Sequence, residues 1–106
     1  MQKLLTKGLE ARFKKVGSQQ EAEDPIVVAK FFNPVGAGDW FATEWLPEEK
    51  VFFGYVSLFN DHNNEFGYFS LEELEEIRLP MGMKIQRDAY CSEMTLSEWK
   101  RTRNIQ

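Results

Sequence analysis

Residues 66–77 have the sequence Phe-Gly-Tyr-Phe-Ser-Leu-Glu-Glu-Leu-Glu-Glu-Ile, which predicts a strand followed at once by an amphipathic helix. Phe66 and Tyr68 alternate with their neighbours at the two-residue period of a strand. Ser70 and Glu73 have the spacing of a capping box, in which each side chain accepts a hydrogen bond from the other residue's backbone N–H. Beyond the cap, apolar and acidic residues separate onto two helical faces. The apolar face is Leu71, Leu74 and Ile77, and the solvent face is Glu72, Glu73 and Glu76.

The remaining patterns predict further strands before this stretch and a strand and a helix after it. We expect helices over 4–16 and after a second capping box at 95–98, a polar connector over 17–24, and strands over 26–32, 40–46, 51–59 and 84–90. This order favours an α+β fold: a single domain, 1–106, with an antiparallel sheet of four to five strands flanked by short helices. The short connections between strands favour a meander with the helices on one face.

Composition indicates a folded domain. The chain has 106 residues, of which 42% are hydrophobic and 14% aromatic, enough for one core. No N-terminal segment resembles a signal peptide, and no run approaches the roughly 20 apolar residues of a membrane span. Cys91 is the single cysteine, so no intramolecular disulfide can form. We therefore expect a soluble, reduced, cytoplasmic protein with no membrane contact.

Charge is distributed unevenly along the chain. Residues 39–76 contain ten acidic residues and one basic residue, whereas the rest contains seven acidic and twelve basic residues. An acidic middle repels the backbone of nucleic acid and attracts a basic protein surface. A solvated helix face is the plainer interpretation of the same residues. The expected partner is a protein with a basic surface, and direct binding to nucleic acid is not expected.

The residues that could support catalysis or metal binding are few. His62, the single histidine, falls in a predicted hairpin loop, and Cys91 has neither a second cysteine nor a nearby histidine to complete a zinc site. The loop with Gly36 and Gly38 lacks the Lys-Ser/Thr of a phosphate-binding loop. We expect no catalytic residue, no cofactor and no metal ion.

The tryptophans suggest where a partner would bind. Strict alternation over 40–46 places Trp40 and Glu44 on one face and Trp45 on the other. One of the two tryptophans should then lie near the surface, where tryptophan is over-represented among binding hot spots. The candidate partner-binding residues are Glu72, Glu73, Glu76, Trp40, Glu44, Trp45, Glu48 and Glu49.

Several motifs in fixed order resemble one small bacterial family. They are Leu4-Leu5-Thr6-Lys7, Asp24-Pro25-Ile26-Val27, Trp40-Phe41-Ala42-Thr43-Glu44, Phe53-Gly54-Tyr55-Val56 and Gly67-Tyr68-Phe69-Ser70-Leu71. The family is the domain of unknown function twenty-nine fifty-eight, common on plasmids, phages and integrated elements. The resemblance covers about Leu4 to Tyr90 and leaves 91–106, with its C-terminal helix, outside. It implies a mobile-element context and assigns no role to any residue.

Together these observations favour a small non-enzymatic protein-binding module with an acidic face. The mobile-element context implies an inhibitor of a host defence complex, such as restriction or CRISPR, or of a nucleic-acid-processing complex. The alternative is a small ligand-binding domain or enzyme with a pocket near the 33–39 loop.

Overall fold

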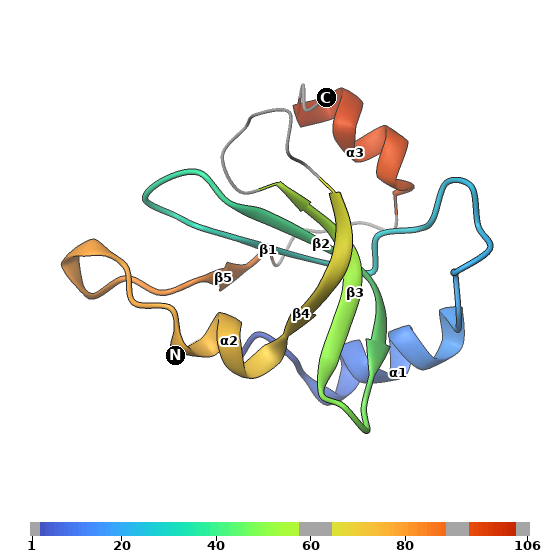
Figure 1. Ribbon diagram of the computed structural model, residues 1–106, viewed down its shortest axis with the longest axis horizontal. Coiled ribbons are helices and arrows are strands. Elements are labelled where there is room, and N and C mark those ends of the chain that lie inside the picture. Colours follow the sequence, from blue (N-terminus) through green and yellow to red (C-terminus); the bar gives the residue numbers. More distant parts are fainter. Residues whose placement is uncertain (1–2, 58–64, 89–93, 104–106) are drawn as a thin grey trace.

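Four consecutive strands form an antiparallel meander, and a short fifth strand pairs with the first (Figure 1). The computed structural model describes residues 3–57, 65–88 and 94–103. Across the sheet the strands lie in the order β4-β3-β2-β1-β5. They are β1 (Ala29–Phe32), β2 (Asp39–Leu46), β3 (Val51–Ser57), β4 (Glu65–Ser70) and β5 (Gln86–Arg87). The predicted α+β fold with an antiparallel sheet is confirmed.

Three helices and one 3-10 turn accompany the sheet. They are α1 (Lys7–Val16), α2 (Leu71–Glu76), η1 (Pro80–Gly82) and α3 (Leu96–Arg103). Helix α1 begins later than the predicted start at residue 4, because Thr6 caps it by accepting a hydrogen bond from Leu9 N. The strand predicted over 26–32 is shorter, since the segment before Ala29 makes an isolated bridge between Ile26 and Thr95 instead of a ladder. The strand predicted over 84–90 contains only Gln86 and Arg87 within the described residues.

Both predicted caps occur. The Oγ of Ser70 accepts a hydrogen bond from Glu73 N at 3.1 Å. At α3 the capping box is reciprocal, because Thr95 N donates to Glu98 Oε1 at 3.1 Å and Glu98 N donates to Thr95 Oγ1 at 3.4 Å. These bonds satisfy backbone donors that a helix start leaves unpaired.

Replacing Ser70 with alanine should lower the free energy of unfolding by about 1 kcal/mol, since the N–H of Glu73 loses its acceptor. Chemical denaturation of the wild type and the variant measures this loss. An unchanged midpoint would show that the cap contributes nothing to α2.

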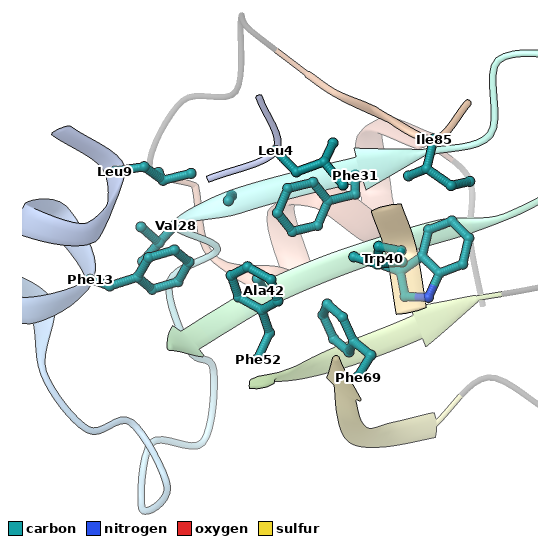
Figure 2. Close-up of a cluster of buried hydrophobic side chains, with 12 residues drawn as sticks. Leu4, Leu9, Phe13, Val28, Phe31, Trp40, Ala42, Phe52, Phe69 and Ile85 are labelled. Carbon is teal, nitrogen blue, oxygen red and sulfur yellow. The ribbon is translucent and has the colours of Figure 1, made fainter. Parts of the chain in front are cut away.

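The main core lies between one face of the sheet and helices α1 and α2. Figure 2 shows Phe13 of α1 next to the strand residues Phe52 and Ala42. The rings of Phe31 and Phe52 are 5.1 Å apart, and those of Phe52 and Phe69 are 5.5 Å apart. Contacts of this kind contribute beyond the apolar area that they bury. The aromatic content of the chain thus supplies its core.

The opposite face of the sheet is covered by α3, so the expectation that all helices lie on one face is wrong. Leu96 and Trp99 of α3 pack against Phe41, Tyr55 and Val27 in a second cluster. Alternation along β2 explains this arrangement, because Trp40 and Ala42 point into the main core while Phe41 points to the other side. Helix α3 is therefore the cover of a second, smaller core.

A β-bulge changes the alternation halfway along β2. Ala42 pairs with Gly54 and Glu44 pairs with Phe53, which leaves Thr43 as the extra residue. Trp45 consequently lies on the same face as Trp40, and its ring is 4.7 Å from that of Phe52 in the main core. The expectation that Trp40 and Trp45 point to opposite faces is wrong for this reason.

The start of α3 is held by Asp24 from the connector. Both carboxylate oxygens of Asp24 accept hydrogen bonds from Ser97, one from its N–H and one from its hydroxyl group. These bonds favour the ionised form and lower the pKa of Asp24 below its ordinary value of 3.8. Hydrogen bonds from Thr95 likewise lower the pKa of Glu98. The contribution of both groups to stability is thus present above their ordinary pKa and disappears as the pH falls below it.

The Asp24→Asn variant should therefore lose stability at neutral pH and lose less than the wild type on acidification below about pH 4. Thermal unfolding followed between neutral and acidic pH measures both slopes. Parallel curves for the two proteins would contradict a role for the Asp24 carboxylate.

Candidate protein-interaction surface

Strands β3 and β4 carry a cluster of four aromatic side chains, of which the two on β4 are exposed to solvent. We define the aromatic cluster as Phe53, Tyr55, Phe66 and Tyr68. Phe66 and Tyr68 are 47% and 62% exposed, although both are large and lie within a regular strand. The rings are in mutual contact: Phe53 lies 6.1 Å from Phe66 and 4.9 Å from Tyr68, and Tyr55 lies 5.3 Å from Phe66. Contiguous exposed apolar surface of this kind is typical of interaction sites.

The cluster is exposed because α3 covers only part of its face. Trp99 lies over Phe41, with ring centroids 5.9 Å apart, on the β2 side of the sheet. Lys100, one residue further along α3, places its Nζ 4.0 Å from the centre of the Tyr55 ring. Beyond Tyr55 the sheet continues to Phe53, Phe66 and Tyr68. The helix therefore borders the aromatic cluster at Tyr55 and leaves its β4 side open.

Two segments that carry exposed carboxylates adjoin at the other end of β4. Glu48 and Glu49 are exposed in the β2–β3 turn, and Glu72 and Glu73 are exposed in the first turn of α2. Two links join these segments: Val51 pairs with Ser70, and Leu71 N donates to Lys50 O at 3.2 Å. We define the acidic cluster as Glu48, Glu49, Glu72, Glu73 and Glu76. The structure thus places five of the eight candidate residues on two adjoining segments, at the end of β4 that follows Tyr68.

The other three candidates are turned away from solvent. Trp40 and Glu44 are each 8% exposed, and Trp45 is half-buried against Phe52. The Oε1 of Glu44 accepts a hydrogen bond from Gln19 N at 2.8 Å. The Gln19 side chain also donates to Thr43 O at the bulge, again at 2.8 Å. Glu44 therefore anchors the 17–24 connector to the sheet, and the expectation of a tryptophan at the surface beside Glu44 is wrong.

The exposed aromatic residues were not among the candidates. The sequence contains one signal for them, because Phe53-Gly54-Tyr55 is repeated as Phe66-Gly67-Tyr68. In the structure these two triplets are register partners, with Gly54 opposite Gly67 and Phe53 opposite Tyr68. Aromatic residues that recur at the same strand phase in neighbouring strands lie on one face of the sheet.

A buried ion pair lies at the end of the 33–39 loop. The Nζ of Lys30 is 3.4 Å from Asp39 Oδ1, and the two side chains are 2% and 11% exposed. Three rings surround the ammonium group, with centroids 5.5 Å away for Phe32, 5.8 Å for Phe41 and 5.4 Å for Trp99. Cation–π attraction and the carboxylate together compensate for the lost hydration of Lys30.

The 33–39 loop itself is closed by its own hydrogen bonds. Asn33 N donates to Gly38 O at 2.9 Å, and Val35 N donates to Asn33 Oδ1 at 2.9 Å. A groove of about 590 Å³ lies elsewhere, between α2 and the segment that follows η1. It is lined by Leu4, Leu74, Glu75, Gly82, Met83, Lys84, Ile85 and Gln86.

Within residues 3–57, 65–88 and 94–103, no three His, Cys, Asp or Glu side chains are grouped so that they could hold a metal ion. His62 and Cys91 lie outside these residues. No helix in the described part of the chain is both long and apolar enough to span a bilayer.

Comparison with known proteins gives one match. The sequence model of a family described as "Protein of unknown function (DUF2958)" matches residues 3–106. The chain belongs to the DUF2958 family. The matched range includes α3 and the residues after Tyr90, which the resemblance seen in the sequence left outside. The part of this DUF2958 chain that the family model matches therefore includes the helix that covers its second core. No curated protein and no solved structure matches this chain.

Proposed function

We propose that this DUF2958 protein is a small non-enzymatic protein-binding module whose partner presents a basic surface. The observation that carries the proposal is the position of the acidic cluster at the end of β4, directly after the exposed Tyr68 of the aromatic cluster. Arginine and lysine side chains bind both kinds of group, since they stack on aromatic rings and pair with carboxylates.

The protein itself contains an example of this chemistry. Lys100 lies over the Tyr55 ring at 4.0 Å, and Tyr55 is in contact with the more exposed Phe66. A basic side chain of a partner could approach Phe66 or Tyr68 in the same way while its neighbours meet the acidic cluster. Exposed aromatic residues supply the desolvated anchor of an interface, and the surrounding charges increase the association rate.

The mobile-element context would make the partner a host defence or nucleic-acid-processing complex. The module would then act as an inhibitor or adaptor that occupies a basic groove, either as a protein ligand or as a mimic of nucleic acid. Carboxylates spaced along one surface repel nucleic acid. The proposed target is therefore the basic groove of the complex, and not the nucleic acid that the groove binds.

The test reverses three charges on α2. The triple variant Glu72→Lys, Glu73→Lys, Glu76→Lys should stay folded, because all three side chains are exposed opposite the buried Leu74. Binding to a partner captured from the natural host and then purified should fall about tenfold or more and become less sensitive to salt. Titration calorimetry of the purified pair at two salt concentrations measures both effects.

The matched control reverses three exposed carboxylates that lie outside the acidic cluster, in Glu10→Lys, Glu21→Lys, Glu23→Lys. The control changes net charge equally and should bind nearly as well as the wild type. The double variant Phe66→Ala, Tyr68→Ala tests the aromatic cluster and should also lose binding. Undiminished affinity in both the α2 variant and the aromatic variant would overturn the proposed surface.

A further inference from the structure

The two edges of the sheet differ in how they are protected. Strand β5 forms one edge with only two residues, and Arg87 Nε donates to Lys3 O at 3.2 Å, so the N-terminal segment lies against it. Short strands and covering segments prevent edge-to-edge pairing. Strand β4 forms the other edge with six residues, Glu65–Ser70, and pairs with β3 alone among the described residues. Proline and charged side chains usually protect an open edge, and the central residues of β4, 66–69, include neither.

We propose that two copies of the chain pair antiparallel through β4, with Gly67 on a two-fold axis, to form one continuous ten-stranded sheet. In this register Phe66 lies opposite Tyr68 of the second copy, and Tyr68 lies opposite its Phe66. Directly opposed residues of antiparallel strands share a face, so the register extends the aromatic cluster of each copy into that of the other. Gly67 meets no atom within 4 Å of where a Cβ would lie, so a side chain introduced on the axis would not clash within its own chain.

Charge also favours a second copy at this edge. The C-terminal end of β4 leads into the acidic residues of α2. Its N-terminal end carries one exposed carboxylate, Glu65, and lies near Lys100, because Lys100 contacts Tyr55 and Tyr55 pairs with Phe66. Antiparallel pairing therefore keeps the two acidic α2 helices apart and places each of them at the end of the other copy where Lys100 lies. A surface that is complementary to itself in this way closes as a two-fold dimer, and the protected β5 edges stop further growth.

The aromatic cluster stays on the open face of the ten-stranded sheet, so the dimer is compatible with the proposed function and does not depend on it. Sedimentation equilibrium of the full chain should give twice the 12.4 kDa of one chain, with weaker association at high salt. A mass of 12.4 kDa at every concentration would overturn the proposal.

A cysteine on the axis tests the register. Cα atoms directly opposite in an antiparallel pair lie about 4.5 to 5.5 Å apart, within the range that a disulfide spans. In a Cys91→Ser background, Gly67→Cys should form a disulfide-linked dimer roughly a hundredfold faster than Ala37→Cys, an exposed cysteine in the 33–39 loop. Equal rates for the two variants would overturn β4 pairing even if the mass were that of a dimer. A dimer that fails to bind any partner would instead count against the proposed function alone.

Discussion

The Gly54→Ala variant should lose about 3 kcal/mol or more of its free energy of unfolding, the largest effect expected of any single methyl group in this chain. A Cβ at this position would lie 1.9 Å from Phe41 O and 2.8 Å from Phe41 C. Both are backbone atoms of β2, so no side chain can rotate away to make room. Gly54 sits opposite Ala42, at the bulge formed by Thr43, and relief would require a shift of the strand itself.

Gly67 provides the matched control, because it is the register partner of Gly54 and has open space where its Cβ would lie. Gly67→Ala should be neutral or slightly stabilising, since alanine loses less conformational entropy on folding than glycine. Urea denaturation of the two variants measures the contrast. Equal stability of Gly54→Ala and Gly67→Ala would show that β2 and β3 do not approach as closely as the structure has them.

The second large effect concerns the buried ion pair. Replacing Asp39 with alanine should cost about 3 kcal/mol, because it removes the carboxylate that lies 3.4 Å from the ammonium group of Lys30, a side chain that is 2% exposed. The rings of Phe32, Phe41 and Trp99 still interact with the ammonium group and compensate for part of the loss. The expected value therefore lies at the lower end of the roughly 3 to 5 kcal/mol that is typical when one partner of a buried ion pair is removed.

Removing both charges should cost much less than removing one. The double variant Lys30→Met, Asp39→Asn keeps similar volumes and removes both charges of this pair, so it should recover at least half of the stability lost in Asp39→Ala. Thermal unfolding of the two variants and the wild type measures the difference. If the double variant is the less stable of the two, the ion pair is worth more than its desolvation cost and the expectation is wrong.

Local signals in the sequence predicted the elements whose geometry depends only on residues close to one another in the sequence. Ser70 and Thr95 were identified as caps because a capping box needs only four consecutive residues. The antiparallel sheet followed from the short connections between strands. The helix over 71–77 was predicted within one residue of its observed end at Glu76.

The faces of β2 were predicted correctly up to Ala42 and wrongly beyond Thr43, because a bulge leaves no local signal in the sequence. Thr43 is a β-branched residue that fits a regular strand, and only its pairing with β3 shows that it is the extra residue. Every alternation argument beyond Thr43 is therefore shifted by one residue. For this reason Trp45 packs against the main core on the same face as Trp40, and not on the opposite face as expected.

The candidate site was predicted in part. The exposed carboxylates of α2 followed from helical periodicity, which separates the faces of a helix without knowledge of its neighbours. The exposed aromatic residues did not, because alternation identifies two faces of a strand and cannot say which face α3 covers. That answer depends on a helix that lies some thirty residues further along the chain, a contact that no local pattern contains.

The position of α3 determines which parts of the fold can form first during synthesis. Strands β1 to β4 form successive antiparallel pairs, so all of these pairs can form once residue 70 has left the ribosome. The cover of Phe41 and Tyr55 comes from Leu96 and Trp99, which are synthesised after the strands. During that interval the nascent sheet exposes its second core as well as the aromatic cluster. We therefore expect chaperones to bind the nascent chain and not the folded protein.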